Sequence, residues 1–348
     1  MDDNKGKTNL KAAPKPAVRI AAAAGVFLLC AVLILLGVVW VLEKGPSPTA
    51  TGTFTRSVRE TSAIRWVSRI FLSEEELEQY KSVSTEEQET AEVNTSLIHM
   101  AEARETEEGG ENLEVLDISA GSCKGKLMIV HDPRTVILGT SEKFEEQPGL
   151  LLTEMVEKYH AVGGINAGGF NDEGGRGDGG TPEGLVISDG VITWGSRGER
   201  YNIVGLDEDG YLHIGNMSGG EALEQGIRWA VSFVTHDGLS SALIINGEIQ
   251  TQNLGGGVNP RTAIGQRKDG ALLLLVLDGR SISTLGASIE DICNIMLEYG
   301  AVNAGNLDGG SSSVMVYGGE IINNCASVVG PRKIPTAFLV LEEGDAHD

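Results

Sequence analysis

The sequence has few of the residues that build metal centres and disulfide frameworks. It contains four cysteines among 348 residues, with no Cys-x-x-Cys spacing, and six scattered histidines without a His-x-x-x-His pair. Cys30 lies in an apolar run near the N-terminus, and the other three cysteines cannot all pair. These absences argue against a zinc site and a disulfide scaffold, while one optional bridge is compatible with the count.

Basic residues are also scarce. The chain has 27 Lys and Arg against 49 Asp and Glu, a formal net charge of -22. The first nineteen residues hold five basic and two acidic side chains, so their charge is +3 and the remainder carries -25. A surface this acidic repels nucleic-acid backbones, and we therefore expect no nucleic-acid partner. The sequence also lacks a Gly-x-Ser-x-Gly elbow, a Walker loop and a dinucleotide fingerprint.

A long apolar run stands near the N-terminus, at Ile20–Leu42. At ~1.5 Å per residue, a helix of this length spans a ~30 Å hydrocarbon core. The sequence predicts an uncleaved signal-anchor, since no small-residue cleavage site follows, and a cleaved export signal is the alternative. By the positive-inside rule, the basic tail 1–19 stays in the cytoplasm and the C-terminal part lies outside the cell.

The segment 43–112 is expected to be a linker and a partly helical acidic stalk. Gly45–Phe54 is rich in Pro, Thr and Ser and indicates a linker. Apolar residues at helical spacing favour a helix within Thr55–Lys81, and Ser73 followed by glutamates indicates the cap of a second short helix. A globular domain is expected at 113–343, with a short tail at 344–348.

The globular part alternates strand-like runs with turn signals. Two helices are predicted, at about Leu150–His160 and at Ile289–Tyr299, the second with a capping box at Ser288 and Asp291. The expected hairpin turns are Asp189-Gly190, Asp209-Gly210, Asn246-Gly247, Asp269-Gly270 and Gly318-Gly319. The fold class is therefore α+β, with mixed, largely antiparallel sheets and flanking helices, after one N-terminal transmembrane helix.

Both predicted helices lead into a short apolar run and an Asn-Ala-Gly triplet, at Asn166-Ala167-Gly168 and Asn303-Ala304-Gly305. Two such units would deliver polar, glycine-rich loops to one edge of a sheet. The second loop contains Asp308, two glycines and three serines, so that small hydrogen-bonding side chains and a carboxylate share a short stretch.

Two further positions favour an oxyanion-binding site. Arg261 follows three glycines at the start of a predicted strand, and its planar fork suits a phosphate or carboxylate. Asp278 ends the apolar strand Leu272–Leu277. Taken singly, Arg261 is alternatively a surface charge or a salt-bridge partner, and Asp278 alternatively caps the next turn. Asp172, Glu173 and Asp178 are weak candidates for a hard cation such as Ca²⁺, although their spacing does not fit an EF-hand; no other cofactor is expected.

Three ordered blocks resemble the signatures of a known family. They are Ile165–Phe170, Pro260–Gly265 and Asn306–Ser312. The resemblance is to the phosphodiester glycosidase family, related to N-acetylglucosamine-1-phosphodiester alpha-N-acetylglucosaminidase, and it covers about Leu113–Glu343. It suggests a bacterial, membrane-tethered member, in which Ala167 stands where glycine is also common.

The resemblance implies hydrolysis of a sugar-1-phosphodiester at the anomeric carbon, with N-acetylglucosamine as the expected sugar, in envelope or exopolysaccharide metabolism. Arg261 would bind the phosphate, and Asp308 or Asp278 would act as a base or stabilise the cationic sugar. The expected substrate-binding residues are Asn166, Gly168, Gly169, Phe170, Thr262, Asn306, Gly309, Gly310, Ser311 and Ser312. The alternative is a membrane-tethered protein that binds phosphorylated cell-surface glycans without cleaving them.

Overall fold

The computed structural model describes most of the globular part and the segment before it. The described residues are 16–80, 91–100, 112–121, 123–172, 177–233, 240–250, 256–279, 281, 284–325 and 330–342. The expected tail 344–348, most of the expected stalk and Glu173 lie outside these ranges.

The described strands form three sheets in which all neighbouring strands pair antiparallel. The strands are β1 (Leu113–Ala120), β2 (Cys123–Val130), β3 (Val136–Thr140), β4 (Ala161–Asn166), β5 (Val186–Ser188), β6 (Val191–Trp194), β7 (Arg200–Asp207), β8 (Leu212–Ser218), β9 (Ile227–Ser232), β10 (Ala242–Ile245), β11 (Glu248–Ile249), β12 (Arg261–Arg267), β13 (Leu272–Leu277), β14 (Ala301–Leu307), β15 (Met315–Tyr317), β16 (Glu320–Ile321) and β17 (Thr336–Leu341). Sheet A has the order β1-β2-β13-β12-β14-β10-β11, sheet B β16-β15-β4-β17-β3, and sheet C β6-β5-β9-β7-β8.

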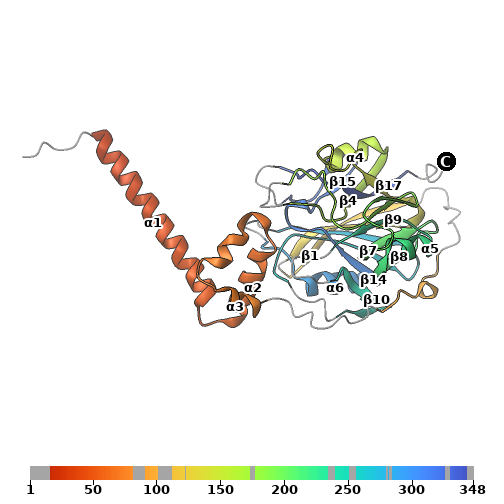
Figure 1. The fold of residues 1–348 in the computed structure, drawn as a ribbon, viewed down its shortest axis with the longest axis horizontal. Coiled ribbons are helices and arrows are strands. Elements are labelled where there is room, and N and C mark those ends of the chain that lie inside the picture. The colour runs from red at the N-terminus through yellow and green to blue at the C-terminus, as the bar shows by residue number, and fades with distance from the viewer. Residues whose placement is uncertain are drawn as a thin grey trace, which may run out of the picture.

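The helices lie before and between these strands in the chain. They are α1 (Pro16–Lys44), α2 (Pro48–Arg59), α3 (Glu74–Glu78), α4 (Leu152–Lys158), α5 (Gly219–Glu224) and α6 (Ile289–Glu298), with 3₁₀ turns η1 (Ser62–Arg69), η2 (Thr95–Leu97), η3 (Pro133–Thr135) and η6 (Gly310–Ser312). Figure 1 shows α4 beside β4, β15 and β17, and α6 on the other side of the body beside β14 and β10. This arrangement confirms the predicted α+β class.

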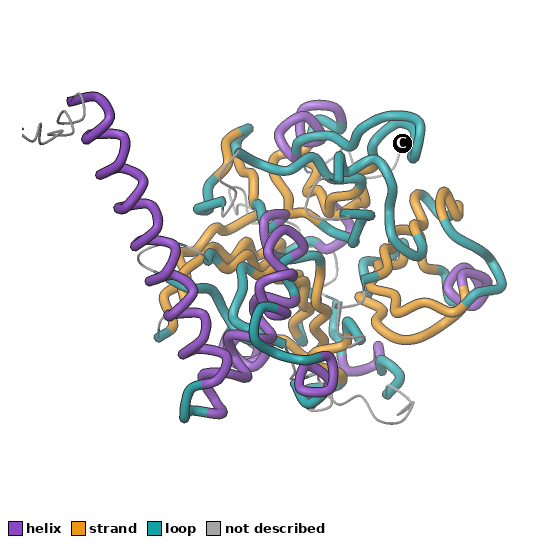
Figure 2. The backbone as a smooth tube through the Cα atoms, turned by 60° about the vertical axis from the view of Figure 1, so that its left-hand side comes forward, coloured by secondary structure: helices purple, strands orange, loops and turns teal. Residues whose placement is uncertain are grey.

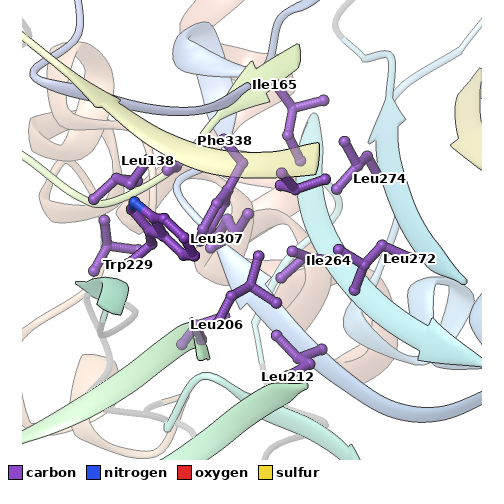
Figure 3. Close-up of a cluster of buried hydrophobic side chains, with 14 of the residues drawn as sticks. Leu138, Ile165, Leu206, Leu212, Trp229, Ile264, Leu272, Leu274, Leu307 and Phe338 are labelled. Atoms are coloured by element: carbon purple, nitrogen blue, oxygen red, sulfur yellow. The ribbon is translucent and has the colours of Figure 1, made fainter. Parts of the chain in front are cut away.

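The main core lies where the three sheets face one another. Figure 3 shows Ile165 and Phe338 from sheet B, Leu206 from sheet C, and Ile264 and Leu307 from sheet A packed together. All five side chains are at most 1% exposed. Because Leu307 is the last residue of β14, this packing fixes the point from which Asp308 and its loop leave the sheet.

The predicted hairpins are confirmed. Each of the five dipeptides joins two strands that pair with each other, as in β5–β6, β7–β8, β10–β11, β12–β13 and β15–β16. Asp189 and Asn246 adopt positive φ angles of 52° and 54°, followed by glycines at 72° and 84°. These angles are the ones that tight hairpin turns require.

The segment before the domain is more ordered than the sequence indicated. Gly45–Phe54, predicted to be a linker, instead contains the start of α2, where Ser47 caps the helix and Pro48 occupies its first turn. Pro fits there because the first helical N–H has no intrahelical acceptor. The second short helix was correctly predicted, and α3 carries a Ser73–Glu76 capping box.

The apolar run Ile20–Leu42 is helical and lies within α1, which Figure 2 shows projecting from the body. By length and composition, α1 is able to cross a membrane. Most of its large apolar side chains are uncovered, and Phe27 is 76% exposed, whereas Val39 is buried. A signal sequence would have the same features.

The two predicted α–β units exist, but their strands belong to different sheets. β4 follows α4 in sheet B, whereas β14 follows α6 in sheet A. The second triplet, Asn303–Gly305, lies inside β14 and is not a loop. The ends of the two strands nevertheless meet, because the Asp308 N–H donates to the Ala167 carbonyl at 3.0 Å.

Candidate functional site

The loop after β14 is held against two other strand ends. The Gly310 N–H donates to the Pro260 carbonyl at 2.8 Å, and Asp308 binds the backbone of Ala167. A Cβ on Gly309 would lie 2.8 Å from the Pro260 carbonyl oxygen, and Gly310 has φ of 65°. Both glycines are therefore needed for this close approach and turn, and the substrate contacts predicted for them stay predictions.

Asn166 is buried and forms hydrogen bonds to three neighbouring segments. Its Nδ2 donates to the Asp308 carbonyl at 2.6 Å, and its Oδ1 accepts from Thr262 Oγ1 at 2.9 Å and from the Val314 N–H at 3.1 Å. Asn166 and Thr262 are at most 1% exposed. The structure thus brings three predicted residues together, and it uses two of them to hold the backbone of Asp308.

Arg332 enters this site from the segment before β17. Its guanidinium grips the Asp172 carboxylate with two hydrogen bonds, of 2.7 and 3.2 Å, and also donates to Ser311 Oγ at 3.2 Å. The guanidinium lies 5.3 Å from the centre of the Phe170 ring. This fork geometry fixes a cation beside the Asp308 loop.

Asp308 lies in an environment that favours its neutral form. Burial raises the pKa of Asp308 to about 7, and the negative charges of Glu183 and Asp172 act in the same direction. A hydrogen bond from Ser312 and the positive charge of Arg332 oppose this change. A carboxyl group with a pKa near neutrality can exchange a proton with a reacting group.

Glu183 supplies a second carboxyl group with a raised pKa. Glu183 is an exposed residue, and its carboxylate lies against Gly169, where a Cβ would be 3.1 Å from Glu183 Oε2. This partial burial raises the pKa of Glu183, Asp172 adds to the effect, and Arg65 of η1 opposes it. We call Asp308, Glu183, Asp172 and Arg332 the carboxylate cluster.

The contacts of Arg261 are with residues outside the carboxylate cluster. Its Nη2 donates to Glu60 Oε2 at 2.8 Å and to the Gly257 carbonyl at 2.6 Å, and its Nε donates to the Ala287 carbonyl at 3.2 Å. Arg261 is 6% exposed. The role predicted for it in phosphate binding stays a prediction, and its present anionic partner is a carboxylate of the N-terminal segment.

Asp278 lies next to the Asp308 loop without joining the carboxylate cluster. Its Oδ1 accepts from the Asn324 N–H at 2.9 Å and from Asn323 Nδ2 at 3.3 Å, and the same Nδ2 donates to the Ser313 carbonyl. Burial raises the pKa of Asp278, while these hydrogen bonds and the charge of Lys126 lower it. Its contacts are those of a residue that positions the loop.

The other predicted ligands occupy the walls of the site. The Gly168 N–H donates to Thr336 Oγ1 at 3.1 Å, and Phe170 is 5% exposed beneath Arg332. Asn306 is 1% exposed, and among the described residues its Oδ1 has no hydrogen-bond partner. Asn306 thus has a free hydrogen-bond acceptor near the end of β14. Leaving such a buried oxygen unpaired costs free energy of folding.

The weak cation candidates have protein partners. Asp172 is paired with Arg332, and Asp178 Oδ1 accepts from the Gly180 N–H at 2.9 Å within its own turn. Glu173 lies outside the described residues. A cation at this loop therefore stays a prediction.

A shallow surface groove is lined mostly by β6 and the segment that leads into β7. It has a volume of about 530 Å³ and includes Gly184, which directly follows Glu183, together with the aromatic residues Trp194 and Tyr201. The Tyr201 hydroxyl donates to Glu199 Oε2 at 2.7 Å and accepts from the Ser196 N–H at 2.9 Å. The groove thus combines half-buried aromatic rings with polar groups, as small-molecule sites commonly do.

Glu183 and Arg332 were not predicted from the sequence. Both follow a proline within a loop, and Pro331-Arg332 shortly precedes a buried strand, as Pro260-Arg261 does. That repeated Pro-Arg pattern was the available signal for Arg332. No sequence signal indicated Glu183, because it stands alone between the glycine-rich loop and β5.

A family model for phosphodiester glycosidase matches residues 159–341. Among curated proteins, an uncharacterized prophage-derived protein of Bacillus subtilis is 37% identical over 87 residues, 25% of this chain and 14% of that protein. The mouse N-acetylglucosamine-1-phosphodiester alpha-N-acetylglucosaminidase is 27% identical over 178 residues, 46% of this chain and 34% of that enzyme. The matched part thus spans about a third or less of these relatives' length.

Among solved structures, the catalytic domain of the zebrafish N-acetylglucosamine-1-phosphodiester alpha-N-acetylglucosaminidase has a similar fold. Its TM-score is 0.54 at 23% identity, and the match covers 68% of this chain and 85% of that domain. At this level of identity, the similarity establishes the fold.

Proposed function

Because the chain belongs to the phosphodiester glycosidase family, we propose that it hydrolyses a sugar-1-phosphodiester at the anomeric carbon. The observation that carries the proposal is the raised pKa of Asp308, about 7, within a cluster that also holds Glu183 and Arg332. Glycoside hydrolysis uses a pair of carboxyl groups, and a raised pKa on one of them suits proton transfer near neutral pH.

The leaving group decides the role of Asp308. A phosphodiester departs as a stable phosphate anion, so protonation of the bridging oxygen matters less than in ordinary glycosides. We therefore assign Asp308, in its ionised form, as the base. It takes a proton from water, the water oxygen bonds to the anomeric carbon, and the bond between that carbon and the bridging oxygen breaks. The electron pair stays on the phosphate oxygen.

In this proposal, Arg332 neutralises the negative charge of the departing phosphate. Its guanidinium already holds the Asp172 carboxylate and reaches Ser311 Oγ, so it is oriented beside Asp308 before substrate arrives. A fixed cation stabilises the negative charge that develops on the departing phosphate. Glu183 would stabilise the positive charge that develops on the sugar ring.

The groove next to Glu183 supports a sugar as the group that is bound. Trp194 and Tyr201 offer apolar ring surface for the carbon–hydrogen face of a pyranose, and Glu199 offers a hydrogen-bond acceptor for its hydroxyls. N-acetylglucosamine in α-linkage is the specific sugar that we propose, from the mammalian relatives.

We also propose that the domain works outside the cytoplasm, attached to the membrane through α1. The apolar length of α1 and the basic residues before it support this orientation. A phosphorylated envelope glycan or exopolysaccharide precursor would then be the natural substrate class.

Hydrolysis in H₂¹⁸O tests the reaction. We expect α-N-acetylglucosamine-1-phosphate methyl diester to release a sugar carrying ¹⁸O and an unlabelled methyl phosphate, measured by mass spectrometry. Asp308→Asn should abolish product, whereas Asp178→Asn, a matched change in a carboxylate that caps its own turn, should not. Label in the phosphate would indicate a phosphodiesterase. Binding without any product would favour the non-catalytic glycan binder.

A further inference from the structure

Ser232, the last residue of β9, places a buried hydroxyl group against the chain that carries Glu183. The Leu185 N–H donates to Ser232 Oγ at 2.8 Å, and Ser232 Oγ donates to the Glu183 carbonyl at 3.0 Å. A hydroxyl group has one donor and two acceptor positions, so it can make both bonds at once. Ser232 is 4% exposed, and the proposed reaction gives its hydroxyl no task.

The backbone around Glu183 is fixed on both sides. The Glu183 N–H donates to the Gly169 carbonyl at 2.9 Å, while Ser232 holds the Glu183 carbonyl. The Ser232 N–H also donates to the Leu185 carbonyl at 3.0 Å, so this serine binds Leu185 through two of its groups. With the backbone fixed in this way, the side-chain torsions of Glu183 alone decide where its carboxylate lies.

Gly184 permits the close approach of the serine. Gly184 has φ of 70°, and a Cβ on it would lie 1.9 Å from Ser232 Oγ. Any other residue at this position would therefore displace the hydroxyl group or the turn. Gly184 also lines the surface groove, so the end of β9 contacts the chain exactly where the groove meets Glu183.

We propose that Ser232 is a positioning residue, which holds Glu183 so that its carboxylate lies beside Asp308 in the carboxylate cluster. This inference rests on the proposed function, because it explains how the role given there to Glu183 is made possible. Truncation of Ser232 would remove a partner from both the Leu185 N–H and the Glu183 carbonyl, and the turn would loosen. Catalysis depends closely on the placement of reacting groups, so turnover should fall.

The charge of Glu183 makes the position of its carboxylate measurable. The negative charge of Glu183 helps to raise the pKa of Asp308, so this pKa should fall when the carboxylate moves away. Ser232→Ala should therefore act on Asp308 in the same direction as Glu183→Gln. The other groups that act on these two carboxyl groups are Asp172, Arg332, Ser312 and Arg65.

Steady-state kinetics on the methyl diester test the role in the reaction. We expect Ser232→Ala to lower kcat ~10-fold with KM nearly unchanged. The pH midpoint of kcat/KM should fall by most of the shift that Glu183→Gln produces. Ser232→Thr keeps the hydroxyl group and should retain both values. Because Ser232 acts through Glu183, Glu183→Gln/Ser232→Ala should be no slower than Glu183→Gln alone.

Ser141→Ala is the matched control. Ser141 is also 4% exposed, but its Oγ has no hydrogen-bond partner among the described residues, so its loss should leave kcat and the pH midpoint unchanged. If Ser232→Ala does not fold, Ser232→Cys takes its place, because a thiol is a poor donor and acceptor. An unchanged pH midpoint, or the same loss of kcat with and without the Glu183 carboxylate, would overturn the proposal.

A second measurement needs no substrate. Thermal unfolding at pH 8 in detergent micelles compares each chain with the same chain carrying Asp308→Asn, which removes the ionised group. The gain in thermal midpoint should be smaller in Ser232→Ala than in the unchanged chain, as in Glu183→Gln, because the pKa of Asp308 is lower. A smaller gain without any hydrolysis would refute the proposed reaction and support the positioning of Glu183. An equal gain would overturn the positioning role, whether or not the diester is hydrolysed.

Discussion

Asp308→Asn should stabilise the folded protein at alkaline pH while it removes activity. Burial and two neighbouring carboxylates raise the pKa of Asp308 to about 7 from its ordinary value of 3.8. Above pH 7 the folded state must therefore hold an ionised group in a position that disfavours it. Asparagine has nearly the same shape as the protonated acid but carries no proton to lose.

The sign and size of the effect follow from proton linkage. Between pH 3.8 and 7, the folded state holds a proton on Asp308 that the unfolded state has lost, so stability falls as the pH rises. Each unit of pKa difference corresponds to about 1.4 kcal/mol, which gives an upper value of about 4 kcal/mol above pH 7. At roughly 2 °C per kcal/mol for a chain of this size, the variant should melt up to ~8 °C higher at pH 8.

The assay is thermal unfolding at several values between pH 4 and pH 9, in the same micelles for each variant. The difference between Asp308→Asn and the unchanged chain should be largest above pH 7 and should vanish near pH 4. Asp178→Asn, at a carboxylate whose Oδ1 accepts from the Gly180 N–H within its own turn, serves as the control. Equal midpoints for Asp308→Asn and the unchanged chain at pH 8 would refute the electrostatic account of the site.

Three other outcomes are expected. With Asp308 ionised as the base, kcat/KM should rise tenfold per pH unit below about pH 7 and level above it, while Asp308→Asn should lose ~10²–10⁴-fold at pH 8. Arg332→Lys should lower kcat at least ~10-fold, because lysine cannot reproduce the two hydrogen bonds to Asp172. Trp194→Ala should raise KM ~10-fold with kcat nearly unchanged, as steady-state kinetics on the methyl diester would show.

Local structure was predictable wherever short-range chemistry determines it. Dipeptides such as Asn246-Gly247 supply the positive φ angles of a hairpin, and Ser288 with Asp291 closes a capping box at the start of α6. The apolar run Leu272–Leu277 is strand β13 with the predicted bounds. The segment around Pro48 was misread, because the same Pro and Ser that mark linkers also begin helices.

Long-range placement was not predictable from the sequence. Nothing local to β4 or β14 indicates that one belongs to sheet B and the other to sheet A. Arg261 forms the salt bridge that was the alternative interpretation of its position, and its partner Glu60, about 200 residues earlier in the chain, could not be identified from a motif. Arg332 joins the site only because β17 lies beside β4.

Side chains alternate between the two faces of sheet A along β12. This alternation explains why the neighbours Arg261 and Thr262 make contacts on opposite sides of the sheet. Arg261 faces α2 and its carboxylate, whereas Thr262 faces Asn166, which in turn holds the Asp308 carbonyl. A shift of β12 by one residue would exchange these faces and remove both sets of contacts. The Pro-Arg-Thr sequence is therefore constrained from both sides of sheet A. For that reason, a change in the contact between the N-terminal segment and Arg261 should alter the position of Asp308. The two are connected along β12 by hydrogen bonds of 2.9 Å or shorter.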